Sequence, residues 1–285
     1  MGHPDPPQHS VGRALIACGG LGTRLLPATK ALPKALLPVL DRPLLQYAVE
    51  EVVAAGIHEI GVLFRADQAA IASALTTPPA LVDQLKRLER RAELANLLRF
   101  DASARFKLFP TSDEAWGLGG QLLALEPFLA DAPFALLMVD ELCDPACNAL
   151  TGLLAVHGSC GLTSVCTHGE TAGTVPYLIG SIPALDAGSG VAGPRPAQAR
   201  MIGRYLCTPD VCVALREVAN RQGLPVDLIA ALRLLAERQA LAAHPYPGRW
   251  WDCGCRSGFV AATLEMAGED PGLGPALWSR LRLAP

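Results

Sequence analysis

The chain has 285 residues, of which 51% are hydrophobic, and a net charge of −3 at pH 7. This length and hydrophobicity suffice for a substantial core, and the lack of a basic block argues against a nucleic-acid partner. The longest strongly apolar run, FALLMV from Phe134, is far too short to span a bilayer, so we expect no membrane partner either.

The N-terminal residues 1–12 lack the apolar core of a signal peptide and are predicted to form a flexible tail. The nine cysteines are scattered along the chain, with no repeated C-x-x-C pair and no histidines at zinc-finger spacing. This spacing argues against a structural zinc site. The odd number of cysteines and the lack of a secretion signal favour reduced thiols and a cytoplasmic location.

Strand and helix patterns alternate through the first half of the chain. Short apolar runs predict strands at 14–18, 59–64, 105–110 and 134–139, and helical spacing predicts helices at 43–57, 81–100 and 119–129. Gly56 is placed to end the first of these helices. The order predicts an α/β, Rossmann-like fold, a mostly parallel mixed sheet with helices on both faces. Ligands of such sheets bind at the carboxyl ends of strands, where a glycine loop and Asp140 both fall.

The second half of the chain is less regular. Strands are predicted at 162–168 and 199–208, helices at 209–222, 226–239 and 257–267, and a turn or strand end at 249–254. The stretch 184–199 is rich in Gly, Pro and Ala and is predicted to be a loop.

The loop after the first predicted strand, IACGGLGTRLLPATKALPKALLPV, has the composition of an anion site. Three glycines within four positions let the backbone approach a ligand closely, and the cations that follow favour a negative one. A P-loop would need a Lys-Ser/Thr pair, which is absent here, and a dinucleotide fingerprint would need glycine at Leu25. The loop therefore predicts phosphate binding of another kind.

The pattern G-G-x-G-T-R-x-x-P-x-T-K-x-x-P-K resembles the signature of the sugar-1-phosphate nucleotidyltransferases. The longer match, GLGTRLLPATKALPKALLPVLDRPLLQYAVEEVVAAGI, is similar to the bacterial UTP–glucose-1-phosphate uridylyltransferase branch, and WGLGG, PFALLMVDEL, MIGRYLCTPDV and WWDCGCRSGFVAATLE extend the resemblance. It implies a GT-A-like domain over 13–267, with a nucleotide half at about 13–150 and a sugar-side half at about 151–267. Residues 268–285 would form a C-terminal tail.

The resemblance also implies which residues contact the nucleotide and the sugar. Gly203 would lie beside the sugar. Gly117 would lie against the nucleobase. The backbone N–H groups that bind the phosphates would come from Gly19, Gly20, Leu21, Gly22 and Thr23.

The chemistry of the implied reaction explains the charged residues. A nucleoside triphosphate and a sugar 1-phosphate are joined and pyrophosphate leaves; the nucleophile is already a charged phosphate oxygen, so catalysis consists of positioning two polyanions and stabilising charge. Arg24 offers a planar fork to the departing pyrophosphate, and Lys34 reaches the α-phosphate as a point charge. Asp140 and Asp252 are the implied ligands of one Mg²⁺.

Several positions depart from the family pattern on the sugar and uracil side. The glutamine expected to read uracil aligns near Ser112, and the family's E-K-P, whose lysine holds the sugar phosphate, is represented only by AGPRP. Arg195 in that stretch is the candidate sugar-phosphate cation, with Arg204 the other cation near in sequence. The nucleobase and the sugar therefore stay open.

Two functions remain compatible with these residues. The first is a nucleotidyltransferase that joins UTP, or another NTP, to glucose 1-phosphate, or a related sugar 1-phosphate, giving an NDP-sugar and pyrophosphate. The second is a catalytically weak paralogue that serves as a nucleotide-binding or regulatory subunit. Intact triphosphate and metal elements favour the first. The family resemblance further implies a homo-oligomer, a dimer or a tetramer.

Overall fold

The structure, a computed structural model, describes residues 11–111, 116–129, 131–168, 177–178 and 200–282. Its centre is an eight-stranded sheet in the order β5-β4-β1-β6-β10-β8-β11-β9. These strands are β1 Arg13–Ala17, β4 Glu59–Arg65, β5 Arg105–Thr111, β6 Phe134–Met138, β8 Thr163–His168, β9 Tyr177–Leu178, β10 Arg200–Cys207 and β11 Leu241–Pro245. Strands β5, β4, β1 and β6 are parallel, whereas β10 runs antiparallel to both β6 and β8. The predicted mostly parallel mixed sheet is confirmed.

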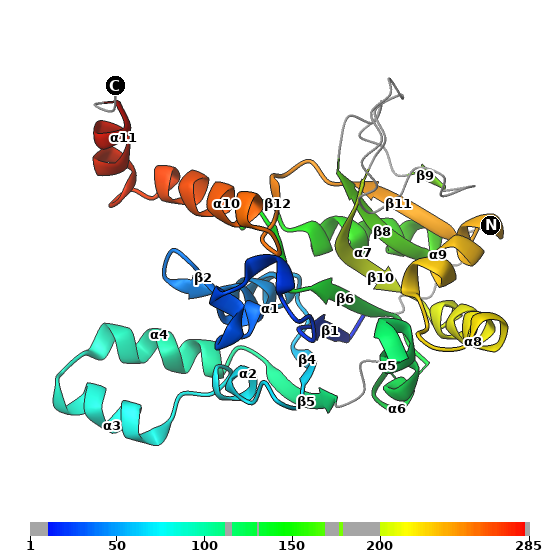
Figure 1. Ribbon diagram of the computed structural model, residues 1–285, viewed down its shortest axis with the longest axis horizontal. Helices are drawn as coiled ribbons and strands as arrows, with labels where there is room; N and C mark the ends of the chain where they lie inside the picture. Colours follow the sequence, from blue (N-terminus) through cyan, green and yellow to red (C-terminus); the bar gives the residue numbers. More distant parts are fainter. Residues whose placement is uncertain (1–10, 112–115, 130, 169–176, 179–199, 283–285) are drawn as a thin grey trace, which may run out of the picture.

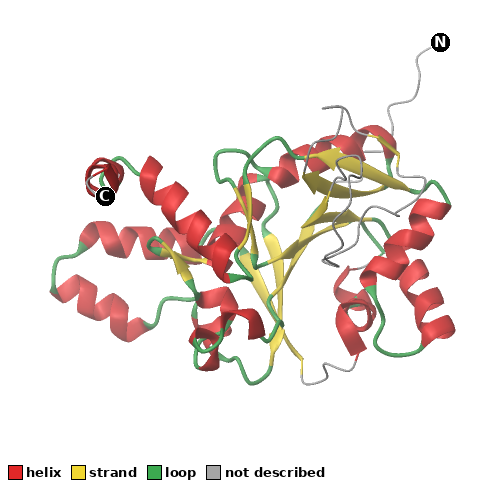
Figure 2. Cartoon of the chain, turned by 45° about the horizontal axis from the view of Figure 1, so that its top comes forward, coloured by secondary structure: helices red, strands yellow, loops and turns green. Residues whose placement is uncertain are grey.

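Helices cover both faces of the sheet, and two small two-stranded sheets flank it (Figures 1 and 2). The small strands are β2 Pro38–Val39 with β3 Arg42–Pro43, and β7 Glu141–Cys143 with β12 Trp250–Asp252. The α-helices are α1 Leu44–Ala54, α2 Ala70–Ser73, α3 Pro79–Arg87, α4 Arg91–Asp101, α5 Gly117–Ala124, α6 Glu126–Leu129, α7 Ala149–Cys160, α8 Asp210–Gln222, α9 Leu228–Glu237, α10 Arg256–Glu269 and α11 Gly274–Arg282.

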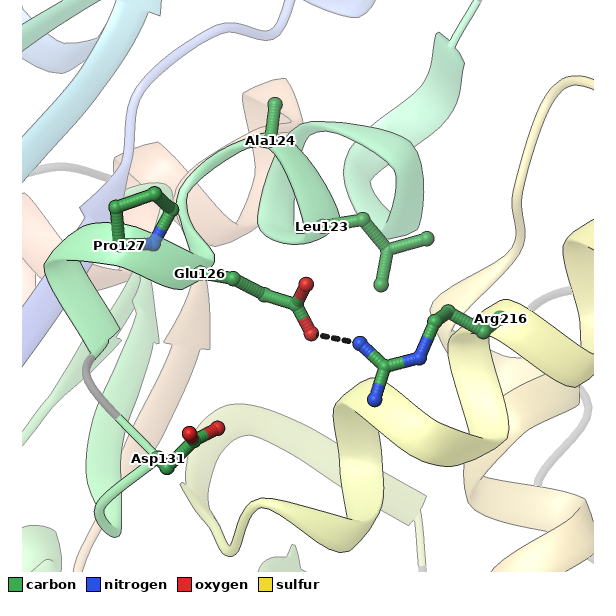
Figure 3. A pocket seen from close by; sticks show the side chains of 6 residues that line it. All are labelled: Leu123, Ala124, Glu126, Pro127, Asp131 and Arg216. Carbon is green, nitrogen blue, oxygen red and sulfur yellow. Dashed lines mark hydrogen bonds and ion pairs between the residues drawn. The ribbon is translucent and has the colours of Figure 1, made fainter.

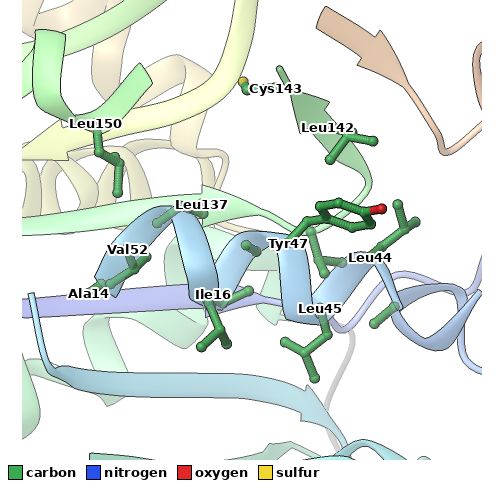
Figure 4. Packing of buried hydrophobic residues seen from close by; sticks show 14 of the residues in the cluster. Ala14, Ile16, Leu44, Leu45, Tyr47, Val52, Leu137, Leu142, Cys143 and Leu150 are labelled. Carbon is green, nitrogen blue, oxygen red and sulfur yellow. The ribbon is translucent and has the colours of Figure 1, made fainter. Parts of the chain in front are cut away.

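The alternation of side chains along β1 explains why the core has two parts. Ala14 and Ile16 point to one face and join a cluster with Leu44 and Leu45 of α1, as Figure 4 shows. Leu15 points to the other face and packs in a second cluster with residues of α5, α8 and α9. A strand that is apolar on both faces reads as a continuous hydrophobic run, which is how 14–18 was predicted.

Two predicted helices are wrong in extent. Residues 81–100 form not one helix but the antiparallel pair α3 and α4, because Glu89 adopts φ 53° and the N–H of Arg90 donates to the carbonyl of Leu85 at 2.9 Å. A left-handed residue at the end of a helix is normally glycine, so a glutamate at this position gives no sign in the sequence that the helix ends here. Residues 119–129 are divided between α5 and α6, where Pro127 lacks the N–H that would continue α5.

The structure also contains elements that the sequence reading left out. Helix α7 begins at an Asn148 cap whose side chain accepts from the N–H of Thr151 at 3.0 Å, and it ends at Gly161 with φ 69°. Strand β11 pairs parallel with β8. Within the predicted C-terminal tail, 268–285, lie the end of α10 and all of α11, which project from the body in Figure 1. Among the described residues, no helix is both long and apolar enough to cross a membrane.

Candidate active site

The glycine loop leaves the carboxyl end of β1 and folds back on itself. Gly22 adopts φ 66°, and its carbonyl accepts a hydrogen bond from the Thr29 hydroxyl at 2.7 Å. A Cβ placed on Gly22 would lie 2.9 Å from Cγ2 of Thr29, so both the backbone angle and the close approach require glycine here. No atom of the described residues lies within 4 Å of a Cβ placed on Gly19. The backbone at Gly19 therefore faces open space, which a ligand can occupy.

Lys34 lies beneath this loop and is paired with the first candidate metal ligand. It starts the short 3₁₀ turn Lys34–Leu36, and its Nζ lies 2.5 Å from Oδ2 of Asp140. A Cβ on Gly20 would be 3.2 Å from the same Nζ, so the ammonium lies directly against the glycine loop. Its side chain is only 11% exposed. Lys34 therefore lies against the loop for which the sequence predicts phosphate binding.

The two candidate metal ligands are brought together by the β7–β12 pair. Asp140 follows β6 and precedes β7, whose first residue, Glu141, is opposite Asp252 of β12. A Cβ on Gly254 would lie 2.5 Å from Oδ2 of Asp140 and 2.9 Å from Oδ1 of Asp252, so both carboxylates border one small space. Two carboxylates suit a hard cation that keeps water and phosphate as its other ligands. In the described part of the chain no group of three or more His, Cys, Asp or Glu side chains forms a closed metal site.

Arg24 forms a two-pronged ion pair with the second carboxylate. Its Nη1 lies 2.9 Å from Oδ2 of Asp252, and its Nη2 lies 3.3 Å from Oδ1. The hydrogen bond to Asp252 raises the pKa of Arg24 above its ordinary value, so the guanidinium stays charged. Its side chain is 58% exposed, which leaves it accessible to a ligand. Each candidate phosphate-binding cation therefore forms an ion pair with one candidate metal ligand.

Glu141 and Arg200 are site residues that the sequence reading missed. Oε2 of Glu141 accepts from the backbone N–H of Gly203 and from Nε1 of Trp250, both at 2.8 Å. Burial raises the pKa of Glu141 above its ordinary value. Arg200 lies over the Trp250 ring, 4.8 Å from its centroid. Glu141 follows Asp140 in VDEL and could have been noticed from that position, whereas nothing in the sequence singles out Arg200.

Gly117 and Arg204 are two further candidate residues within the described part of the chain. Gly117 starts α5, and a Cβ on it would lie 2.9 Å from the carbonyl of Val226, so its near neighbours belong to the segment before α9. Arg195 lies outside the described residues, as does Ser112. Arg204 is not available to a sugar phosphate, a correction to its candidacy.

The reason lies in the environment of Arg204. Its side chain is 2% exposed, and its Nε donates to both carboxylate oxygens of Glu51 on α1, at 3.0 and 2.9 Å. A second guanidinium nitrogen, Nη1, donates to the carbonyls of Met138 and Gly203. Arg204 therefore joins α1, β6 and β10 within the fold.

An open hollow of about 740 Å³ lies away from these residues (Figure 3). An ion pair between Glu126 and Arg216 joins α6 to α8 across it. Its lining consists of Leu123, Ala124, Glu126, Pro127, Asp131 and Arg216, and none of these was predicted to take part in catalysis.

Comparison with known proteins places the chain in a family. Residues 13–92 match the nucleotidyl transferase family model. The UTP–glucose-1-phosphate uridylyltransferase of Staphylococcus epidermidis is 30% identical over 272 residues, which cover 92% of this chain and 94% of that relative. The chain belongs to the UTP–glucose-1-phosphate uridylyltransferase family. The Bacillus subtilis member is also 30% identical, over 271 residues that cover 91% of this chain and 92% of that one.

Solved structures share the fold of this uridylyltransferase family member. A UTP-bound enzyme from Acinetobacter baumannii superposes with a TM-score of 0.81 at 22% identity, covering 97% of this chain and all of that one. A ligand-free UDP-glucose pyrophosphorylase superposes with a TM-score of 0.74 at 25% identity, covering 90% and 98%. The prediction of a nucleotidyltransferase enzyme is confirmed at the level of the family, and none of these relatives supports the alternative of a non-catalytic paralogue.

Proposed function

We propose that the chain joins UTP to glucose 1-phosphate, giving UDP-glucose and pyrophosphate. The observation that carries the proposal is the convergence of the glycine loop, Lys34 and Arg24 with two carboxylates on the space above Gly254. The uridylyltransferase relatives favour UTP and glucose 1-phosphate over other NTPs and sugars.

The loop and the two cations promote the reaction by positioning the phosphate groups and neutralising their charge. Backbone N–H groups from Gly19 to Thr23 bind phosphate oxygens, as the open space at Gly19 allows. Lys34 neutralises the α-phosphate where the sugar phosphate oxygen attacks, and Arg24 holds the departing pyrophosphate with two parallel hydrogen bonds. The attacking oxygen already carries charge, so no residue need remove a proton.

Asp140 and Asp252 fit a Mg²⁺ ion, since both are oxygen ligands on one space and Gly254 leaves room beside them. When bound, the ion would neutralise charge on the reacting phosphates. The ion pairs of Lys34 with Asp140 and of Arg24 with Asp252 keep both cations beside the space where the two carboxylates would hold the ion. Both cations are thus placed to contact phosphate groups at that space.

Several further parts of the proposal follow the family. Gly117 would contact the nucleobase and Gly203 the sugar, within one domain over 13–267, and Arg195 is the family-aligned candidate for the sugar-phosphate charge. We also propose a homo-oligomer, a dimer or a tetramer, and a cytoplasmic location.

Replacing Arg24 tests the proposed mechanism. Pyrophosphate release should be measured for each of the four NTPs with a panel of sugar 1-phosphates, and UTP with glucose 1-phosphate should be fastest. Arg24→Ala should lower kcat by on the order of 10²-fold, because its hydrogen bonds strengthen as charge develops on the leaving group. Arg42→Ala is the matched control, since Arg42 is also partly exposed and forms an ion pair, with Glu50 at 2.9 Å. Retention of more than a tenth of kcat by Arg24→Ala would exclude this role.

A further inference from the structure

The sugar 1-phosphate needs a cation on its own side of the site, and Arg200 is placed to supply one. Arg200 is the first residue of β10, which runs antiparallel to β6, so it lies beyond the carboxyl end of β6, close to Asp140. Its side chain is 56% exposed. Arg204, four residues on, is buried in its pair with Glu51 and cannot do this.

A hydrogen-bonded support fixes the guanidinium of Arg200. It lies 4.8 Å from the centroid of the Trp250 ring, and the ring nitrogen donates to Glu141 at 2.8 Å. The same Glu141 oxygen accepts from the N–H of Gly203, so one carboxylate ties β12 to β10. His168 belongs to β8, which pairs with β10, and the centroid of its ring lies 5.9 Å from that of the Trp250 ring. A guanidinium stacked on a fixed indole is pre-oriented, and because the side chain is exposed its N–H groups are accessible to an anion.

A shift in strand pairing gives β10 this arrangement. Arg200 and Met201 pair with His168 and Thr167 of β8, but the register then shifts before Tyr205. The irregular stretch contains Gly203, whose N–H turns to Glu141. A bulge of this kind re-aims side chains and is frequent beside active sites.

The charges around Asp252 match the need to bring two anions together. Asp252 contacts Arg24 at 2.9 Å and Arg200 at 3.9 Å, so one carboxylate holds two guanidinium groups. The reaction requires two phosphate-bearing substrates in one place. If Asp252 binds a metal ion, each guanidinium becomes available to one of the two substrates.

We infer that Arg200 binds the phosphate group of the sugar 1-phosphate, held in position by Trp250 and Glu141. This rests on the proposed function and supplies, from β10, the charge that the missing E-K-P lysine would have given. It differs from the assignment of that charge to Arg195.

Steady-state kinetics of pyrophosphate release separate the roles of these residues. Arg200→Ala should raise KM for glucose 1-phosphate by roughly tenfold to a hundredfold, the range expected for a lost hydrogen bond to a charged group, and change KM for UTP less than about twofold. Arg200→Lys should fall between, because it keeps the charge and loses the planar fork. Arg90→Ala is the control, an arginine of the α3–α4 hairpin whose partner is Glu93. Arg195→Ala should have a smaller effect than Arg200→Ala.

Calorimetric titration with glucose 1-phosphate gives a second readout that does not need turnover, provided the protein is first bound to a UTP analogue with a methylene bridge between its α- and β-phosphates, which cannot release pyrophosphate. The Arg200→Ala protein should bind glucose 1-phosphate at least tenfold more weakly than wild type. An unchanged KM and affinity, or a larger effect of Arg195→Ala, would overturn the inference while leaving the proposed function intact. Equal increases in KM for both substrates with a lower melting temperature would show a purely structural role. Wild type that binds glucose 1-phosphate through Arg200 but releases no pyrophosphate would contradict the proposed function alone.

Discussion

Gly254 is the position where a single methyl group should disable the site without unfolding the protein. Its φ lies outside the left-handed region, so alanine is allowed by the backbone. The added Cβ would nevertheless lie 2.5 Å from Oδ2 of Asp140, 2.6 Å from Nη2 of Arg24 and 2.9 Å from Oδ1 of Asp252. Ordinary contact begins at 3.4 Å, so these atoms must retreat by roughly half to one ångström.

Gly254→Ala should therefore lower kcat by on the order of 10²-fold, since a displacement of about 1 Å in a reacting constellation has effects of that size. Its free energy of unfolding should change by less than about 1 kcal/mol, because all three crowded atoms end side chains that can move. The assay is pyrophosphate release as a function of Mg²⁺ concentration, with urea unfolding alongside. Gly158→Ala is the matched control, a glycine of α7 where an added Cβ meets no atom of the described part of the chain within 4 Å. A Gly254→Ala enzyme with wild-type kcat and Mg²⁺ dependence would refute the reasoning.

Three other outcomes follow. Asp140→Asn should raise the Mg²⁺ concentration needed for half-maximal activity or abolish turnover, and activity in full chelation would contradict this role. Arg204→Met should lower the free energy of unfolding by about 3 kcal/mol or more, because Glu51 is left charged and without this ion-pair partner. In urea unfolding, the double variant Arg204→Met/Glu51→Met should recover part of that loss. Equal losses of stability in the single and the double variant would contradict this explanation. Burial lowers the pKa of His244 below its ordinary value of 6.5. Above pH 6.5 the neutral His244 makes its full contribution to the free energy of unfolding. As the pH falls below 6.5, the unfolded chain takes up a proton that the folded chain resists, so this contribution is lost. Urea unfolding at pH 7.5 and 5.5 should show a smaller drop for His244→Gln than for wild type, and an equal drop would contradict it.

The glycine loop and the sheet could be predicted because local residues determine them. No distant contact is needed to recognise the glycines Gly19, Gly20 and Gly22 or the apolar runs at 14–18 and 134–139. Because β1 and β6 are parallel neighbours, their carboxyl ends lie at the same edge of the sheet, which places Asp140 near the loop. The helices at 209–222 and 226–239 were likewise set by local periodicity, and α9 is capped by Asp227, whose side chain accepts from the N–H of Ile229.

The remaining features depend on contacts that the sequence does not display. Arg200 and Arg204 are only four residues apart in the sequence, yet Glu51 on α1 pairs with the buried Arg204 while Trp250 on β12 stacks with the exposed Arg200. Their partners are far away in the chain, so only the assembled fold distinguishes them. The break between α3 and α4 is similarly hidden, because Glu89 takes a backbone angle that local pattern assigns to glycine.

The most direct test of the central claim is the identification of products from UTP and glucose 1-phosphate incubated with the protein and Mg²⁺. Mass spectrometry should detect UDP-glucose, and a coupled assay should detect one pyrophosphate for each UDP-glucose formed. Raised thermal stability with UTP, together with neither product for any NTP and sugar 1-phosphate pair, would contradict the account, because it would show a nucleotide-binding protein without nucleotidyltransferase activity.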